Sequence, residues 1–595
     1  MQETPDSMRH SHDGYEKDDD NDVKRSETRT PTSDMEKGLQ LKPTPSGGPV
    51  VHHKMNRKLF MTLVCMSFLW IGSQIPLYIF GSVLPLIYQD IGGVDRYTWF
   101  VIGYLIPNAA LCPFVGALSD LFGRRNVAIV GQVALIVGPI ITATANTMNI
   151  AIAGQVFSGI GAGLNELISL AGTGESVPVK DRGKYVGLVV FTILPFCPSV
   201  LYAQMIAKVS HWRYNGILVG VWNFIGLILC IFCYKDPSRL NEEYTARHVL
   251  RQVDYIGGFL SAAGVTCFMM GLQWGASQYS WGSAHNLAPL ILGIVLIIAF
   301  FVWEFFAPYP MVPRALFSKA KKTMIVILLI TFLSGGNYFV MLLFWPTQVY
   351  NVYGDDPLGI GIRSLPIGFG IIGGAVICLV LIPITKGRIR ELMIFFTALM
   401  TAGTGAVAVS TPHNLNALYA IVTLASIGVG GVIIPSSIIA QIACPDELIA
   451  TITAITLSIR YIGGAIGFAV YSNLFFRKVT DELTVIVATK TLAGQFIVNP
   501  STRAGLGVIT HITELVSNAR FDEVKEILAT SPSVFRRDAY PMIVASAQEA
   551  FANAYRWPYY VSIAFGALCF ILSFFVGNIG SLLTNEVAAP VEEEE

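Results

Sequence analysis

The chain has 595 residues, with 40 basic (Lys plus Arg) and 40 acidic (Asp plus Glu) side chains, so its formal net charge at pH 7 is zero. Hydrophobic residues make up 53% of the chain and charged residues only 13%, whereas charged residues are roughly a quarter of an average soluble protein. The low charge content excludes an ordinary soluble protein and indicates one that lies in a lipid bilayer. The zero net charge gives no sign of a nucleic-acid partner.

The first stretch of the chain is polar and contains few large apolar side chains. Such a segment cannot bury enough apolar surface to fold, so we expect residues 1–57 to form a disordered cytosolic tail. The acidic run Glu16–Asp22 is either a docking site or part of a solvated tail, and its composition favours the second interpretation. We expect no cleavable signal peptide, because no short apolar core segment occurs here.

Fourteen apolar runs, each long enough to cross a bilayer, follow along the chain. A helix that spans the hydrocarbon core needs about 20 mostly apolar residues. Backbone polar groups in lipid must pair within their own segment, so these runs predict helices and not strands. The runs begin near Leu59, Tyr97, Asn126, Ile150, Tyr185, Tyr214, Tyr255, Leu287, Thr323, Gly359, Leu392, Leu415, Ile449 and Trp557. The predicted fold class is therefore an all-α membrane protein with 14 transmembrane helices.

Basic residues are distributed unevenly between alternate loops. One set of loops, together with the segment just before the first helix, holds most of the Lys and Arg. The other short loops hold only Arg96, Lys208 and Arg213. Because cytosolic loops of membrane proteins carry an excess of Lys and Arg, we expect both termini to be cytosolic.

The helix order predicts two six-helix bundles with two extra helices inserted between them. The predicted domains are a tail (1–57), an N-terminal bundle (58–236), a linker with two transmembrane helices (237–322), a C-terminal bundle (323–585) and an acidic cytosolic tail (586–595). The C-terminal bundle contains a long polar loop, 477–556, on the extracellular side. Within it, Glu482–Ala488 and Ile543–Ala554 are predicted as short amphipathic helices. The loop is interpreted either as a lid over the outer mouth or as a disordered insertion.

A short charged turn lies between the second and third predicted helices. It contains Gly116, Asp120, Gly123, Arg124 and Arg125. The turn resembles the corresponding loop of major facilitator superfamily carriers, which makes these residues candidates for a gating motif. Two interpretations stay open: Asp120 latches the cytosolic gate by approaching the N-terminus of the thirteenth helix, or the turn only pins the orientation of the chain through its arginines.

Few ionisable side chains lie inside the predicted spans, where a charge is costly and is usually paired or functional. Glu166 is the only carboxylate well inside a core helix, and Arg460 lies near the middle of the thirteenth helix. We predict that Glu166, together with Arg460, couples transport to protons; the alternative is a structural salt bridge between the two. Polar or charged candidates for the wall of a substrate cavity are Gln74, Asn337, Tyr338 and Arg363.

Prolines and glycines mark special places within the spans. Pro195 and Pro198 interrupt the fifth helix and Pro346 the ninth, because proline removes an internal backbone hydrogen bond. Such breaks either line a transport path or are static kinks. The run Gly368–Gly373 fits a dinucleotide-binding pattern, but it lies inside a predicted span with no strand before it, so we interpret it as a site of close helix packing.

Several further stretches resemble the fungal trichothecene efflux pump family, a branch of the major facilitator superfamily similar in layout to fourteen-helix siderophore–iron transporters. They are Ile91–Arg96 with Trp99, Gly159–Leu167, Arg182–Tyr185, Ile193–Ser199, Trp212–Tyr214 and Trp557–Gly566. The resemblance covers roughly residues 59–585. It implies the major facilitator fold and proton-coupled export of a small hydrophobic secondary metabolite, toxin or drug. It also implies a monomer in the plasma membrane, or else in a vacuolar or vesicular membrane.

Two departures from related antiporters bear on the coupling mechanism. Many drug–proton antiporters carry an arginine early in the fourth helix, where this chain has Gln155. Their glycine-proline motif in the fifth helix is replaced by the pair Pro195 and Pro198. The direction of transport therefore rests on the family resemblance and not on a coupling motif.

Two other functions are alternatives to export. The first is uptake of ferric siderophores by proton symport, and the second is a sensor or scaffold that keeps the fold without transport, against which the intact Asp120, Arg124 and Arg125 argue. An enzyme is not predicted, because no His, Cys or Ser arrangement with catalytic spacing occurs. No ATP-binding Gly-x-x-x-x-Gly-Lys-Ser/Thr motif occurs either, so we predict a proton gradient as the energy source and no cofactor or metal.

Overall fold

The computed structural model describes residues 57–93, 96–234, 254–277, 279–354, 356–492, 511–512, 515–516, 521–530 and 539–583. The predicted tail up to residue 56, the acidic tail 586–595 and most of 493–538 lie outside these ranges. Within them, the regular structure consists of helices, as the sequence predicts for an all-α membrane protein.

The first half of the chain supplies six long helical segments. They are α1 (Arg57–Ser82), α3 (Tyr97–Phe122), α4 (Arg124–Ala143), α5 (Met148–Glu175), α6 (Arg182–Phe191) continued by α7 (Ser199–Val209), and α8 (Asn215–Cys233), with a short α2 (Leu84–Ile91) after α1. The hairpin α10 (Tyr255–Ser277) and α11 (Ala284–Phe306) comes next.

The second half supplies another six. They are α12 (Lys321–Phe339) continued by α13 (Trp345–Tyr353), α14 (Pro357–Ile384), α15 (Ile389–Ala406), α16 (Leu415–Ala443), α17 (Ile449–Leu492) and α20 (Ala539–Ser573), with α19 (Phe521–Thr530) between the last two. Among the described residues, twelve segments are long and apolar enough to cross a membrane. The helices α5 and α20 are long but less apolar, and with them the count is compatible with the fourteen predicted spans.

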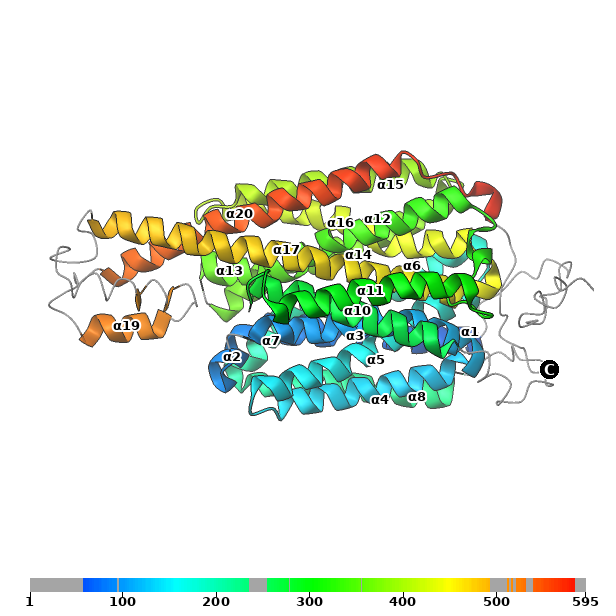
Figure 1. The fold of residues 1–595 in the computed structure, drawn as a ribbon, viewed down its shortest axis with the longest axis horizontal. Helices are drawn as coiled ribbons and strands as arrows, with labels where there is room; N and C mark the ends of the chain where they lie inside the picture. The colour runs from blue at the N-terminus through cyan, green and yellow to red at the C-terminus, as the bar shows by residue number, and fades with distance from the viewer. Residues whose placement is uncertain are drawn as a thin grey trace, which may run out of the picture. The chain divides into compact units, whose positions relative to one another are not determined.

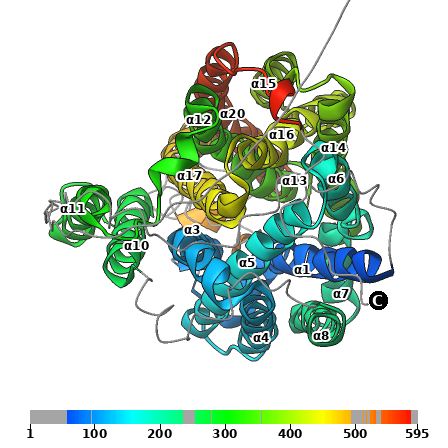
Figure 2. The same ribbon diagram turned by 90° about the vertical axis from the view of Figure 1, so that its right-hand side faces the viewer.

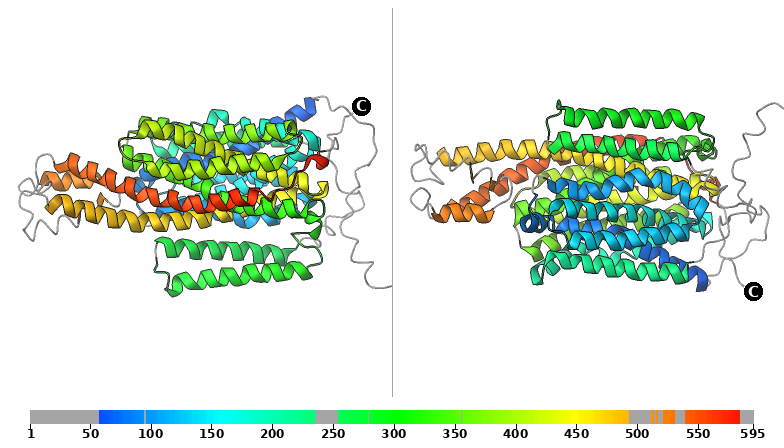
Figure 3. Two further views of the ribbon diagram at one scale, coloured as in Figure 1. Left: turned by 90° about the horizontal axis from the view of Figure 1, so that it is seen from above. Right: turned by 60° about the horizontal axis from the view of Figure 1, so that its bottom comes forward.

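The two halves lie side by side, and the hairpin lies outside them. Figure 2 shows α1 to α8 on one side and α12 to α20 on the other, with α5 and α17 near the seam between them. The hairpin helices pack against each other, and α10 also contacts α3 and α17. Figure 3 shows this hairpin standing beside the remaining helices. It therefore flanks the seam and contributes no residue to the wall of the cavity described below.

The predicted breaks occur where proline interrupts the helices. After α6 the chain forms a 3₁₀ turn, Leu194–Phe196, and α7 begins directly after Pro198. After α12 the backbone widens into a π-helical turn, Val340–Phe344, directly before α13 and its Pro346. Both breaks lie beside the cavity described below, and π-helical turns are frequent at functional sites.

Glycines let the helices approach closely, as predicted. Gly159 and Gly161 of α5 lie against the backbone of Tyr104 in α3 and of Gly131 in α4. The Gly368–Gly373 run lies inside α14, where Gly370 faces α16. The packing interpretation of that run is confirmed.

The prediction for the polar loop 477–556 is wrong at both of its ends. Glu482–Ala488 is not a separate short helix but continues α17, and Ile543–Ala554 lies within α20, which begins at Ala539 and not near Trp557. The extensions pack on each other: the Phe475 and Tyr555 rings are 4.4 Å apart, and Asn553 donates a hydrogen bond to Glu482. Figure 1 shows both helices running past the others, close to α19.

Candidate functional site

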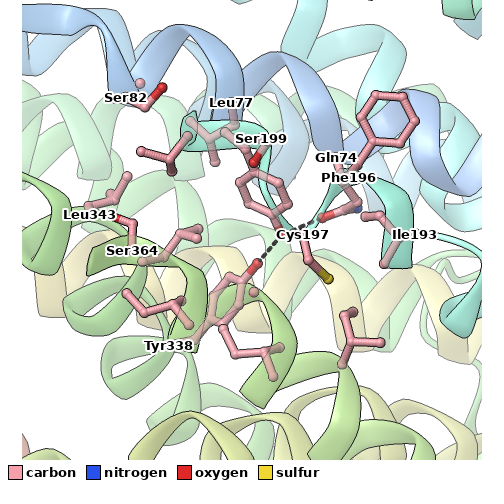
Figure 4. Close-up of a pocket in the computed structure, with 18 of the residues that line it drawn as sticks. Gln74, Leu77, Ser82, Ile193, Phe196, Cys197, Ser199, Tyr338, Leu343 and Ser364 are labelled. Carbon is pink, nitrogen blue, oxygen red and sulfur yellow. Dashed lines mark hydrogen bonds between the residues drawn. The ribbon is translucent and has the colours of Figure 1, made fainter. Parts of the chain in front are cut away.

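A cavity of about 1000 Å³, including the part open to solvent, lies between the two halves. Its wall is mostly apolar and comes from α1, the α6–α7 break, the α12–α13 break, α14 and α16, with single residues from α5 and α17. Its polar members are Gln74, Tyr78, Ser82, Glu166, Ser199, Tyr338, Ser364 and Arg460. Figure 4 shows the side chains that surround this space. A pocket with an apolar wall and a few placed polar groups is typical of a site for a small organic molecule.

A hydrogen-bonded chain crosses the cavity from one half to the other. The hydroxyls of Tyr78 in α1 and Tyr338 in α12 are 2.7 Å apart. The Tyr78 hydroxyl donates to Oε1 of Gln74, at 3.2 Å. Figure 4 shows Gln74 and Tyr338 pointing toward each other across the space. These three side chains place hydroxyl and amide groups in an otherwise apolar wall, and they tie α1 to α12.

A buried carboxylate lies in the cavity wall. Glu166 of α5 is completely buried, and its Oε1 accepts a hydrogen bond from Nη2 of Arg460 in α17, at 2.5 Å. Its Oε2 accepts a hydrogen bond from the hydroxyl of Tyr461, at 2.7 Å. The Arg460 guanidinium also lies over the Tyr461 ring, 4.9 Å from its centre. Both oxygens of the carboxylate on one half are thus held by the other half.

The predicted cavity candidates divide into two groups. Gln74 and Tyr338 line the cavity, as do Glu166 and Arg460. Asn337 and Arg363 do not. Asn337 is buried against Gly566 of α20, and Arg363 donates a hydrogen bond to the carbonyl of Tyr353 at the end of α13, at 3.0 Å.

Two residues of the site were missed by sequence reasoning. Tyr78 lies four residues after Gln74, which places both on one face of α1, and this spacing was the available signal. Tyr461 follows Arg460 directly. Because tyrosine is uncharged and common in buried cores, the sequence gives no signal that separates it from a packing residue.

The predicted gating motif lies at one end of the helices, called here the motif end. Gly123 has a φ of 83°, a left-handed conformation that favours glycine, and it separates α3 from α4. Arg124 is buried and pairs with Glu175 at the end of α5, at 2.5 Å. Arg125 donates to the carbonyl of Ile231 in α8, at 2.6 Å. The motif arginines are thus held by other helices of the first half.

The motif also touches the second half. A Cβ on Gly116 would lie 2.6 Å from the Cβ of Ala454 and 3.3 Å from the carbonyl oxygen of Ala450, so α3 and α17 meet there with almost no space between them. Asp120 is one turn further along α3, and its side chain is outside the described part of the structure.

A second tie between the halves at the motif end was missed. Arg182, the first residue of α6, is completely buried. It donates to the carbonyl of Gly174 at 2.7 Å and to the carboxylate of Asp446, just before α17, at 2.8 Å. The sequence suggested only a role in membrane orientation for this arginine, because nothing local to it points to a partner 264 residues away.

No group of three or more His, Cys, Asp or Glu side chains that could hold a metal ion occurs in the described ranges. The nine cysteines all lie in those ranges, and none of them forms a disulfide there. The chemistry of the cavity is therefore that of one buried ion pair, a few hydroxyls and amides, and an apolar wall.

Comparison with known proteins places the chain among membrane transporters. Residues 54–594 match the model of the fungal trichothecene efflux pump (TRI12) family. The chain is 26% identical over 530 residues to the MFS-type transporter gkaD of Penicillium citrinum, covering 87% of this chain and 84% of that protein. It is 24% identical to the MFS-type efflux pump LUC4 of a Fusarium species, covering 92% and 93%.

Two further similarities point the same way. The trichothecene efflux pump TRI12 of Fusarium sporotrichioides is 23% identical, with 85% of this chain and 84% of that protein covered. Among solved structures, the proton:xylose symporter XylE of the major facilitator superfamily matches with a TM-score of 0.50 and 13% identity, covering 88% of this chain and 98% of that chain. The structural match concerns the fold alone.

Proposed function

The chain belongs to the fungal trichothecene efflux pump family of the major facilitator superfamily and is a multi-pass membrane transporter, and we propose that it exports a small hydrophobic secondary metabolite, toxin or drug in exchange for protons. The observation that carries the proposal is the buried Glu166–Arg460 pair in the wall of an apolar cavity between the halves. It supplies a titratable group at the place where cargo and conformational change meet.

The proton acts through the tie between the halves. A proton on Glu166 removes the negative charge that Arg460 pairs with, and the buried guanidinium then lacks its counter-ion. Breaking a buried pair on one side costs about 3–5 kcal/mol, enough to change which arrangement of α5 and α17 is more stable. If Glu166 takes up a proton from one side of the membrane and releases it to the other, the two halves would thus be driven between two arrangements.

The composition of the cavity wall limits the kind of molecule that the cavity can bind. Leu77, Phe196, Ile367, Ile371 and Ile434 contribute apolar surface around the Gln74–Tyr78–Tyr338 chain. A ligand with an apolar body and one or two hydroxyl or carbonyl groups satisfies such a wall. A strongly charged ligand would lose its hydration with few groups to replace it.

The proposed orientation rests on the charge pattern of the loops. With the basic loops in the cytosol, the motif end is cytosolic and the opposite end faces outward. Gly116 against α17, and Arg182 on Asp446, then close the cytosolic side. The proposed location is the plasma membrane, with both termini in the cytosol and the monomer as the working unit.

The test is transport by the purified full-length protein in proteoliposomes. An extract of the source organism's secondary metabolites is added under an imposed pH gradient, and mass spectrometry identifies what accumulates. We expect at least one apolar metabolite to accumulate with the gradient and not without it. Accumulation of ferric siderophores alone, with impaired growth of a deletion strain only on siderophore iron, would show that uptake is right and export wrong.

A further inference from the structure

A second cavity lies next to the central one, toward the end of the helices opposite the motif end. It contains about 990 Å³ of empty space, including the part open to solvent. Gly81 and Leu343 line both cavities, so the two adjoin. Its wall comes from α1, α2 and α3 of the first half and from α13, α17 and α20 of the second. We call it the aromatic vestibule.

Aromatic rings from both halves line the aromatic vestibule: Tyr88, Tyr97, Phe344, Phe475, Phe476 and Tyr555. The rings of Tyr97 in α3 and Phe476 in α17 meet nearly edge to face, with centres 6.3 Å apart, and Tyr88 lies 6.0 Å from Tyr97. On the other side, Phe475 lies 4.4 Å from Tyr555. Rings in these orientations present both faces and edges, which hold another flat ring by offset stacking and edge-to-face contact.

None of the residues that line the aromatic vestibule is Asp, Glu, Lys, Arg or His. Its polar groups are hydroxyls and one amide, and the Asn351 amide already donates to the Tyr555 hydroxyl, at 2.9 Å. Among the described residues, the hydroxyls of Tyr88 and Tyr97 have no hydrogen-bond partner. A charged molecule would lose hydration here without a counter-charge, whereas a neutral one with a hydroxyl or carbonyl finds both ring contacts and hydrogen-bonding groups.

The long helix α17 places these rings near the edge of the membrane. At a rise of 1.5 Å per residue, Phe475 lies about 39 Å along the axis from Ile449, where α17 begins. The hydrocarbon core is about 30 Å thick. The rings of Phe475 and Phe476 therefore lie where a solute passes from the apolar interior to water.

We propose that the aromatic vestibule is a second binding site, distinct from the central cavity, for neutral, flat aromatic or conjugated molecules. It holds such a molecule on the outer side after the central cavity has released it. This role in release rests on the export function proposed above, but binding to the vestibule does not depend on transport and is measured separately.

The test uses a thiol as a reporter inside the vestibule. Thr347 lines it and is half-buried, and its hydroxyl bonds to the carbonyls of Leu343 and Phe344 one turn earlier and to the Tyr555 hydroxyl. A thiol is close in size to this side chain and takes over its weak hydrogen bonding, so Thr347→Cys is a mild change. The full-length Thr347→Cys protein is placed in nanodiscs, and a small neutral methanethiosulfonate reagent measures the labelling rate with the unsubstituted protein as background. Three probes compete with the reagent: 2-naphthol (neutral and flat), 1-adamantanol (neutral and compact) and naphthalene-2-sulfonate (flat and charged).

We expect saturating 2-naphthol to slow labelling about tenfold, and the other two probes to slow it less than about twofold. Adding Tyr97→Leu and Phe476→Leu should remove most of this protection, because both rings line the site and are only half-buried. Adding Phe570→Leu instead should leave it intact; Phe570 is also half-buried and also pairs with a ring, 5.1 Å away, but does not line the vestibule. Thermal unfolding checks that each variant is folded.

Two outcomes would overturn the proposal: protection that survives loss of both rings, and equal protection by all three probes. The Glu166→Gln variant separates this proposal from the proposed function. If it keeps the protection by 2-naphthol but does not couple transport to protons, both hold. If the unsubstituted protein shows protection but no transport, the vestibule is a binding site and the export function is wrong.

Discussion

Glu166 and Arg460 lie 294 residues apart in the chain, yet they form a fully buried ion pair across the seam between the two halves, with Oε1 and Nη2 2.5 Å apart. Among the described side chains the two charges pair with each other, and the Tyr461 hydroxyl donates to the second oxygen of the carboxylate. Because a single proton would change the charge of this pair, we propose that it links protonation to the contact between α5 and α17.

The close approach of α3 and α17 at Gly116 predicts a sensitive position. Gly116→Val would push side-chain atoms into Ala454 and the Ala450 carbonyl, at a cost of about 1–3 kcal/mol for overpacking. We expect the motif end to open more often and transport to slow, measured by labelling of engineered cysteines in the cavity from the cytosolic side. The control is Gly220→Val in α8, where a Cβ meets no atom within 4 Å. Equal labelling in both variants would contradict the prediction.

Asp120→Asn separates the two interpretations of the motif. Asp120 follows Gly116 by one turn, on a helix that is in contact with the start of α17. A carboxylate near a helix N-terminus stabilises the structure that holds it there by roughly 0.3–1 kcal/mol when exposed, and by up to about 2 kcal/mol when partly buried. If Asp120 latches the cytosolic gate, we expect the Asp120→Asn protein to insert normally, to transport more slowly, and to show faster labelling of cavity cysteines from the cytosolic side. Wild-type transport and unchanged labelling would show that the motif serves only orientation.

The tie between Arg182 and Asp446 should stabilise closure of the motif end. A double-mutant cycle of Arg182→Gln and Asp446→Asn is expected to give a coupling of about 0.5–3 kcal/mol in the free energy of thermal unfolding. The control cycle uses Lys184→Gln and Asp181→Asn, an exposed pair at 3.0 Å within the first half, for which about 0–1 kcal/mol is expected. A coupling no larger than that of the control would exclude a structural role for the buried pair.

The sequence predicts best the features that depend on a few neighbouring residues. Pro195, Pro198 and Pro346 remove backbone donors where they stand, so the interruptions of α6–α7 and α12–α13 were predictable. The pairing of Glu166 was open to prediction for a different reason. A carboxylate inside a span needs a cation, and Arg460 is one of very few at similar depth.

The features that were not predictable depend on how each helix is rotated. Asn337 and Tyr338 are neighbours in α12, but only Tyr338 faces the cavity. Because α12 is apolar on most sides, its residue pattern does not reveal which side faces the interior. The extension of α17 beyond Arg477 was missed for another reason: it is stabilised by packing against α20, a contact between segments far apart in the chain.

The central claim is that Glu166 carries the coupled proton, and Glu166→Gln tests it most directly. In proteoliposomes, a gradient of about one pH unit corresponds to about 1.4 kcal/mol per proton, so one-for-one exchange gives about tenfold accumulation of the metabolite identified above. The control is Glu304→Gln, which alters a carboxylate that binds backbone N–H groups of Met311 and Val312 outside the cavity. We predict that Glu166→Gln abolishes accumulation but keeps metabolite exchange at equal pH, while Glu304→Gln keeps both. Undiminished accumulation by Glu166→Gln would contradict the account.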